Sequence, residues 1–193
     1  MDNDVLPYSS APVLQSGPVL TGAREPRSTG ARSLAISNGR LGMIFLIGTE
    51  TILFSSFLGA YLVLRMGALS WPPPGTPVLS LGLSSLNTSV LVISTILAFR
   101  KQIQATFVMG TLFLILQALE FHRLYARGLT LQTGAYGALF YSLISCHGLH
   151  VLGGLAILAA AYVKRGEWLG HAQLYWHFVT GVWLVLFAIL YLV

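Results

Sequence analysis

Five long apolar blocks constrain the fold of this sequence more than any other feature. Each is close to the ~20 residues that a helix needs to cross ~30 Å of hydrocarbon, and in lipid the backbone must satisfy its own hydrogen bonds. The blocks cover about residues 41–64, 78–99, 106–121, 134–163 and 171–193, the third being rather short. Short connections make consecutive helices antiparallel. We therefore predict an all-α fold, an integral membrane bundle of five transmembrane helices.

The composition agrees with this prediction. Of the 193 residues, 55% are hydrophobic and only 9% are charged, whereas a soluble domain carries about 25% charged residues. Most of the chain therefore cannot face water. The single cysteine, Cys146, lies inside an apolar block and excludes an internal disulfide or a cysteine-based metal cluster.

Residues 1–35 differ from the rest of the chain. They contain four prolines with scattered Gly, Ser and Thr, and no apolar window long enough to pack. We expect a disordered or surface-draped N-terminal tail, followed by a transmembrane domain over residues 36–193. No apolar core with a basic start lies near Met1, so a cleaved signal peptide is not expected.

The distribution of Lys and Arg predicts the orientation. Eight of these residues fall in the tail and in the second and fourth connections, and three fall in the first and third connections. Because positive charge stays on the cytoplasmic side, the N-terminus is expected inside and the C-terminus outside.

Glu50 is the most unusual residue of the first block. It follows Arg40 by about ten residues, which places it about 15 Å along the helix, near the middle of the membrane. Intramembrane carboxyls usually face a bundle interior or a water-filled path. Two roles are open: proton handling or pairing with a partner, and a protonated side chain that only hydrogen-bonds a neighbouring helix.

His147 and His150 lie three residues apart in the fourth block, as neighbours on one helix face. Small residues at every fourth position lead up to His150: Gly134, Ala138, Ser142 and Cys146. Such a stripe lets a second helix approach closely in lipid. The histidines are therefore expected to hydrogen-bond at a packed helix contact rather than to face lipid.

A metal or haem site is the competing interpretation. Zinc requires three or four converging ligands, and a di-iron carboxylate site requires two Glu-x-x-His repeats, which this sequence lacks. The intramembrane donors are few: His147, His150, His177, Glu50 and Glu120. We expect no metal or cofactor in this chain.

Other polar and aromatic residues have structural interpretations. Trp71, in a proline-rich stretch at 71–77, is expected at the membrane interface, and Trp176 and His177 are expected to anchor or pack the last helix. Gln117 and Glu120 are expected at a solvated helix end. No phosphate-binding loop, nucleophile elbow or cysteine pair is present, so the chain alone is not predicted to be an enzyme.

Several stretches, each on its own hydrophobic block and in this order, resemble cytochrome c oxidase subunit III and its relatives in the haem-copper oxidase complexes. They are GTETILFSSFLGAYLVLR, LSSLNTSVLVIST, QALEF, CHGLHVLGG and YWHFVTGVWLVLFAILYL, within about residues 40–193. By this resemblance, Glu50 matches the family's intramembrane carboxyl. Structural or lipid-contact positions of the family are matched by Trp71, Asn87, Glu120, His147, His150, Trp176, His177, Phe178 and Trp183.

The resemblance implies an accessory, non-redox subunit of a proton-pumping terminal oxidase, which reduces O₂ to water in aerobic respiration. Haems and copper would belong to partner subunits I and II, with subunit I as the main contact. The chain would stabilise subunit I, bind structural phospholipid and support proton uptake in a bacterial plasma membrane. Many bacterial members have five helices, without the first two of the seven-helix form.

The sequence departs from the family pattern at some positions, and alternative functions stay open. Thr180 stands where the family usually has Asp, and Ile144 and Ser145 stand where Thr-Gly is frequent. One alternative is a related subunit of a quinol oxidase or nitric oxide reductase complex. Another is a free-standing haem- or metal-binding membrane protein that uses the three histidines named above. A transporter is disfavoured because no inverted repeat is visible.

Overall fold

The structure, a computed structural model, describes residues 38–77, 79–164 and 168–192. The tail predicted over residues 1–35 lies outside the described residues. Within them the chain forms five α-helices that are long and apolar enough to cross a membrane, and no strand. The predicted all-α bundle of five membrane-spanning helices is confirmed.

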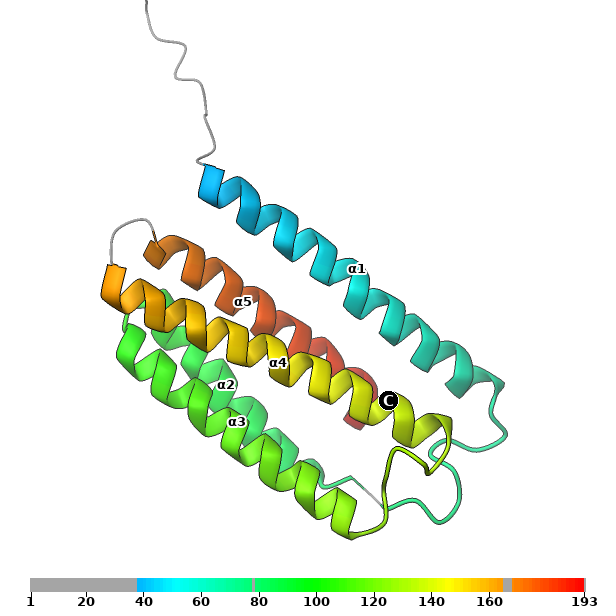
Figure 1. The fold of residues 1–193 in the computed structure, drawn as a ribbon. Coiled ribbons are helices and arrows are strands. Elements are labelled where there is room, and N and C mark those ends of the chain that lie inside the picture. Colours follow the sequence, from blue (N-terminus) through cyan, green and yellow to red (C-terminus); the bar gives the residue numbers. More distant parts are fainter. Residues whose placement is uncertain (1–37, 78, 165–167, 193) are drawn as a thin grey trace, which may run out of the picture. The chain divides into compact units, whose positions relative to one another are not determined.

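The helices are α1 (Asn38–Gly67), α2 (Leu81–Phe99), α3 (Ile103–Ala126), α4 (Ala135–Lys164) and α5 (Trp168–Phe187), and α5 continues into a π-helical turn, η1 (Ala188–Leu192). Consecutive helices run antiparallel (Figure 1). The apolar block at 106–121 understates α3, which has 24 residues because the helix continues through His122 and Arg123.

Two helices end with the same backbone turn but with different residues in it. After α3, Gly128 has a φ of 94° and the next amide donates a hydrogen bond back into the last turn of the helix. After α2, the backbone amide of Gln102 donates a hydrogen bond to the Leu97 carbonyl at 3.0 Å. The residue that precedes Gln102 in this turn is Lys101, which has a φ of 59°. Glycine is the usual residue in this left-handed position. Lys101 is therefore an exception.

Helices α2 to α5 form the packed part of the bundle. Contacts join α2 to α3, α3 to α4, α4 to α5 and α5 back to α2, so the four helices close a ring. The principal contacts of α1 are with α4 and α5, and its buried residues are only Phe54 and Tyr61. Accordingly, α1 lies against one side of the other helices (Figure 1).

Trp176 of α5 lies at the centre of this ring. Its indole ring occupies the space over two glycines, so that a Cβ at Gly154 would lie 3.0 Å from Cε3 and a Cβ at Gly110 would overlap the ring. Its Nε1–H donates a hydrogen bond to Ser94 Oγ of α2 at 3.2 Å. One fully buried side chain thus holds α5 to α2, α3 and α4.

Substitution of Gly110 tests this contact. Gly110→Ala places a methyl group in the Trp176 ring, and overpacking of this kind costs about 1–3 kcal/mol. Gly148→Ala is the matched control, because a Cβ there meets nothing within 4 Å and alanine is a better helix former than glycine by about 0.5–1 kcal/mol. Thermal unfolding in detergent should show a lower midpoint for Gly110→Ala only. Equal midpoints would contradict the contact.

Candidate functional site

Glu50 of α1 pairs with His150 of α4. Its Oε2 lies 2.6 Å from His150 Nε2, and the side chains are 20% and 16% exposed, respectively. The other ring nitrogen, Nδ1, lies 2.6 Å from the carbonyl oxygen of Cys146. A carbonyl only accepts, so Nδ1 carries a hydrogen and donates it.

This geometry is compatible with two protonation states of the pair. With Nδ1 protonated, a neutral imidazole offers Nε2 as an acceptor, and Glu50 must then be a protonated acid that donates to it. Alternatively, an imidazolium donates Nε2–H to a carboxylate. Both forms contain one proton between Glu50 and His150, and they interconvert by moving it along one short hydrogen bond. The pair can therefore hold a proton within the membrane-spanning part of the chain.

His147 has a different environment from His150. It is 1% exposed and packs against the rings of Phe54, Phe113 and Trp183, at centroid distances of 6.3, 6.1 and 5.1 Å. Neither ring nitrogen has a hydrogen-bond partner among the described residues. The prediction that both histidines lie at packed helix contacts is correct, but the prediction that both form hydrogen bonds is wrong for His147. Side chains three residues apart on a helix point in directions that differ by about 60° around its axis, so His147 and His150 can meet different neighbours.

The aromatic residues of α5 are packing residues. Trp183 is fully buried, meets Phe113 edge-to-face and donates Nε1–H to Thr88 Oγ1 at 3.0 Å. His177 stacks on Phe99 with ring centroids 3.9 Å apart. Phe178 is partly buried and lines an apolar groove between α1 and α5. Like Trp176, these side chains join α5 to its neighbours.

Thr180, which departs from the family pattern, is 4% exposed. Its Oγ1 lies 2.7 Å from Thr95 Oγ1 of α2, and it donates to the Trp176 carbonyl at 3.0 Å. A neutral pair of hydroxyl groups thus occupies the α2–α5 contact at this position.

Polar residues on α2 and α3 form two hydrogen-bonded pairs that were not predicted from the sequence. Ser84 Oγ donates to Glu120 Oε1 at 2.5 Å, and Asn87 Nδ2 donates to Gln117 Oε1 at 2.9 Å. Glu120 is 2% exposed, so the prediction of a solvated helix end is wrong. The reason is that α3 continues to Ala126 and α2 packs along it. The sequence did contain a signal for this contact. Two polar residues lie three positions apart on α2, and two more lie three positions apart on α3, which runs antiparallel to α2.

This cluster also contains unsatisfied groups. Glu120 Oε2, Asn87 Oδ1 and the Tyr191 hydroxyl are buried and have no hydrogen-bond partner among the described residues. Tyr191 belongs to η1, so the cluster brings the end of the last helix to α2 and α3. Buried polar groups of this kind are usually bridged by water.

Trp71 holds the connection between α1 and α2 against the bundle. Its Nε1–H donates to the Tyr61 hydroxyl at 2.9 Å, and its ring meets Tyr61 and Tyr136 edge-to-face at 5.3 and 5.2 Å. The residue expected at the membrane interface thus links α1 to α4.

The predicted residues therefore gather in separate places. Glu50 meets His150, and Glu120 meets Ser84, whereas His147 and His177 lie in different aromatic contacts. Within residues 38–77, 79–164 and 168–192, no group of three or more His, Cys, Asp or Glu side chains could hold a metal ion.

Comparison with known proteins places this bundle in a family. The family described as cytochrome c oxidase subunit III matches residues 22–193. The cytochrome c oxidase subunit 3 of Alkalihalophilus pseudofirmus is 33% identical over 203 residues, which cover 92% of this chain and 97% of that protein. The proteins of the same name from Synechocystis sp. and Bacillus subtilis are 34% and 31% identical, covering 78% and 86% of this chain and 74% and 92% of their own lengths. Five membrane-spanning helices and a match over nearly the whole described chain lead to one conclusion: the chain belongs to the cytochrome c oxidase subunit III family.

Proposed function

We propose that this chain is the accessory, non-redox subunit III of a proton-pumping terminal oxidase that reduces O₂ to water. In this role it stabilises subunit I, binds structural phospholipid and supports proton uptake, while partner subunits hold the haems and copper. The family match carries the assignment to an oxidase complex. The Glu50–His150 pair supports the proton role, because one proton is held there on a short hydrogen bond.

The proposed setting is a bacterial plasma membrane with the N-terminus inside and the C-terminus outside. Arg40 near the start of α1, Arg100 and Lys101 after α2, and Lys164 at the end of α4 all lie at the end of the bundle where α1 begins. We name this the basic end. Its charge supports the orientation, since positive residues favour the cytoplasmic side. Subunit I is the proposed main partner, with contacts to subunit II and small subunits.

Co-purification tests the proposed function. The full chain, tagged and extracted from its native membrane in mild detergent, should carry a larger haem-containing membrane protein with it. The isolated complex should show haem absorption and consume O₂ with a suitable electron donor. A Soret band that stays with this chain after all partners are removed would overturn the non-redox role.

Glu50→Gln keeps a hydrogen bond to His150 but removes the carboxyl group that can gain or lose a proton. A glutamine amide donates to His150 Nε2 as a protonated Glu does, so we expect the variant to assemble with an unchanged amount of subunit per haem. Glu50→Leu is the control, because it leaves Nε2 without a partner, which costs about 1–3 kcal/mol. Quantitative gels of the purified complex measure both. Equal losses in Gln and Leu variants would mean that assembly needs the ionised carboxyl.

Replacing each of the two histidines by leucine should affect retention of the subunit in the complex differently. His150→Leu removes the partner of Glu50, so we expect weaker retention of the subunit in the complex. His147→Leu replaces an imidazole without hydrogen bonds by an apolar side chain of similar size, so retention should change little. Haem content per subunit I should stay the same in both variants, as measured by pyridine haemochrome spectra. A lower ratio would show that a histidine of this chain holds haem.

A further inference from the structure

A second carboxyl group lies inside the bundle, apart from Glu50. The described residues contain two carboxyl side chains, Glu50 and Glu120. Glu120 is 2% exposed and lies within about two turns of the end of α3, at the end of the bundle opposite to the basic end. We name this the outer end, after the proposed orientation. Glu120 takes no part in the Glu50–His150 pair, so its role needs a separate account.

The hydroxyl of Ser84 can serve Glu120 in either charge state. It carries one hydrogen, and two acceptors lie within range, Glu120 Oε1 at 2.5 Å and the Ser80 carbonyl at 3.0 Å. When Glu120 is ionised, Ser84 donates this hydrogen to the carboxylate. When Glu120 is protonated, the acid can donate to Ser84 Oγ while Ser84 donates to the carbonyl. Rotation of one hydroxyl therefore accommodates a proton that Glu120 gains or loses.

The other oxygen of Glu120 belongs to a set of buried polar atoms. Among the described residues, Glu120 Oε2, Asn87 Oδ1 and the Tyr191 hydroxyl have no hydrogen-bond partner. The Tyr191 hydroxyl lies close enough to Glu120, Ser84 and Gln117 to interact with all three. A water molecule donates and accepts, so one water can bridge a carboxyl oxygen, an amide oxygen and a phenol hydroxyl. These atoms form a site for such a water next to the acid.

Tyr191 also lines a pocket at the outer end. The pocket has a volume of about 380 Å³ and lies between the end of α1, the α1–α2 connection, the start of α4 and η1. We name it the outer-end pocket; its polar and aromatic lining residues are Tyr61, Arg65, Trp71, Tyr136 and Tyr191. The Tyr191 ring packs against Phe140 and Phe187 at centroid distances of 6.4 and 5.5 Å. This side chain therefore connects the pocket to the buried atoms around Glu120.

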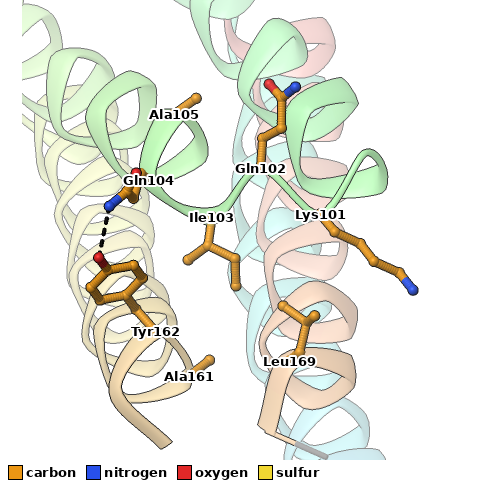
Figure 2. Close-up of a pocket in the computed structure, with 8 residues that line it drawn as sticks. All are labelled: Lys101, Gln102, Ile103, Gln104, Ala105, Ala161, Tyr162 and Leu169. Atoms are coloured by element: carbon orange, nitrogen blue, oxygen red, sulfur yellow. Dashed lines mark hydrogen bonds between the residues drawn. The ribbon is translucent and has the colours of Figure 1, made fainter. Parts of the chain in front are cut away.

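A pocket at the basic end, between α3, α4 and α5, does not offer the same chemistry. It has about 560 Å³, and its polar groups Gln104 and Tyr162 are hydrogen-bonded to each other at 2.8 Å, while Lys101 extends away from that pair (Figure 2). Tyr162 is 47% exposed. A buried hydroxyl without a partner, beside a buried acid, thus distinguishes the outer-end pocket from this one.

The charged and titratable groups around Glu120 come from several helices. Arg123 acts on Glu120 from the same helix and Tyr191 acts on it from η1, and Tyr136 of α4 acts on Tyr191. Arg65, near the end of α1, lines the outer-end pocket. None of these described groups is a second carboxyl. Glu120 is therefore the acid of this cluster.

We propose that Glu120 is a proton-exchanging group at the outer end, which gives and receives its proton through a bridging water and the Tyr191 hydroxyl. On release, the O–H bond at Glu120 Oε2 breaks and the proton passes to water of the outer-end pocket. The carboxylate that remains accepts the hydrogen of Ser84, and uptake reverses these steps without transfer of an electron. This exchange goes beyond the proposed function, and only its placement on the outer face depends on the proposed orientation.

Infrared spectroscopy of the purified complex tests the proposal. The C=O stretching band of a protonated carboxyl shifts in D₂O, and the part of this band that is lost in Glu120→Gln belongs to Glu120. We expect this part to exchange with D₂O and to titrate with pH. Tyr191→Phe should slow its exchange about tenfold, the factor that one hydrogen bond is worth. Tyr61→Phe is the matched control, because that hydroxyl lines the same pocket but already accepts from Trp71.

A second pair of variants leaves the buried cluster intact and obstructs the pocket. Leu192 lines the outer-end pocket and is 64% exposed, whereas Met66 lies at the same end, is 78% exposed and does not line it. Each is replaced by cysteine in a Cys146→Ala background and labelled with a bulky maleimide. Labelling of Leu192→Cys should slow exchange of the Glu120 proton, and labelling of Met66→Cys should leave the rate unchanged.

Each contrary outcome has a distinct meaning. Unchanged exchange in Tyr191→Phe, equal slowing in Tyr61→Phe, or no effect of the label at Leu192→Cys would overturn the route through Tyr191 and the pocket. A Glu120 band that is missing at every pH, or that never exchanges, would overturn proton exchange itself. A carboxylate band that responds to Na⁺ and not to pH would make the cluster a cation site instead. Failure of the wild-type chain to co-purify with a haem protein would refute the proposed function, while the Glu120 band could still be measured on the full chain.

Discussion

The position of the Trp176 ring over Gly110 and Gly154 is the constraint on which the other contacts of the bundle depend. In lipid there is no hydrophobic driving force between helices, so their association relies on close packing and on hydrogen bonds. Small residues on α3 and α4 create the space, and a large ring on α5 fills it. Because the same indole donates to Ser94 on α2, this packing also sets the register of α2 against α5.

Once the register is set, polar side chains on neighbouring helices meet each other. Ser84 meets Glu120 and Asn87 meets Gln117 between α2 and α3, and the hydroxyls of Thr95 and Thr180 meet between α2 and α5. A lone polar group in hydrocarbon costs several kcal/mol, so each pair opposes sliding of the helices. Thr180 has a further effect. Because a hydroxyl is neutral, the α2–α5 contact avoids the charge that an aspartate would bring.

Much of this architecture could be predicted from the sequence, because length and apolarity specify a membrane helix almost alone. The five helices are of this kind. The placement of both histidines at helix contacts was predicted instead from the small residues at every fourth position before His150. The environments of Glu120 and His147 could not be predicted, because they depend on which helix covers each face. A charged end to the apolar block at 121 suggested water near Glu120, yet α3 continues and α2 covers it.

The peripheral position of α1 has a consequence for how the protein is made. The helices that α1 contacts most, α4 and α5, are the last to be synthesised. The first helix therefore waits in the bilayer while three more segments are inserted, and Glu50 enters lipid before its partner His150 exists. The docking of α1 onto α4 is then the event that first brings Glu50 to His150, so this pair forms only after α4 has been inserted.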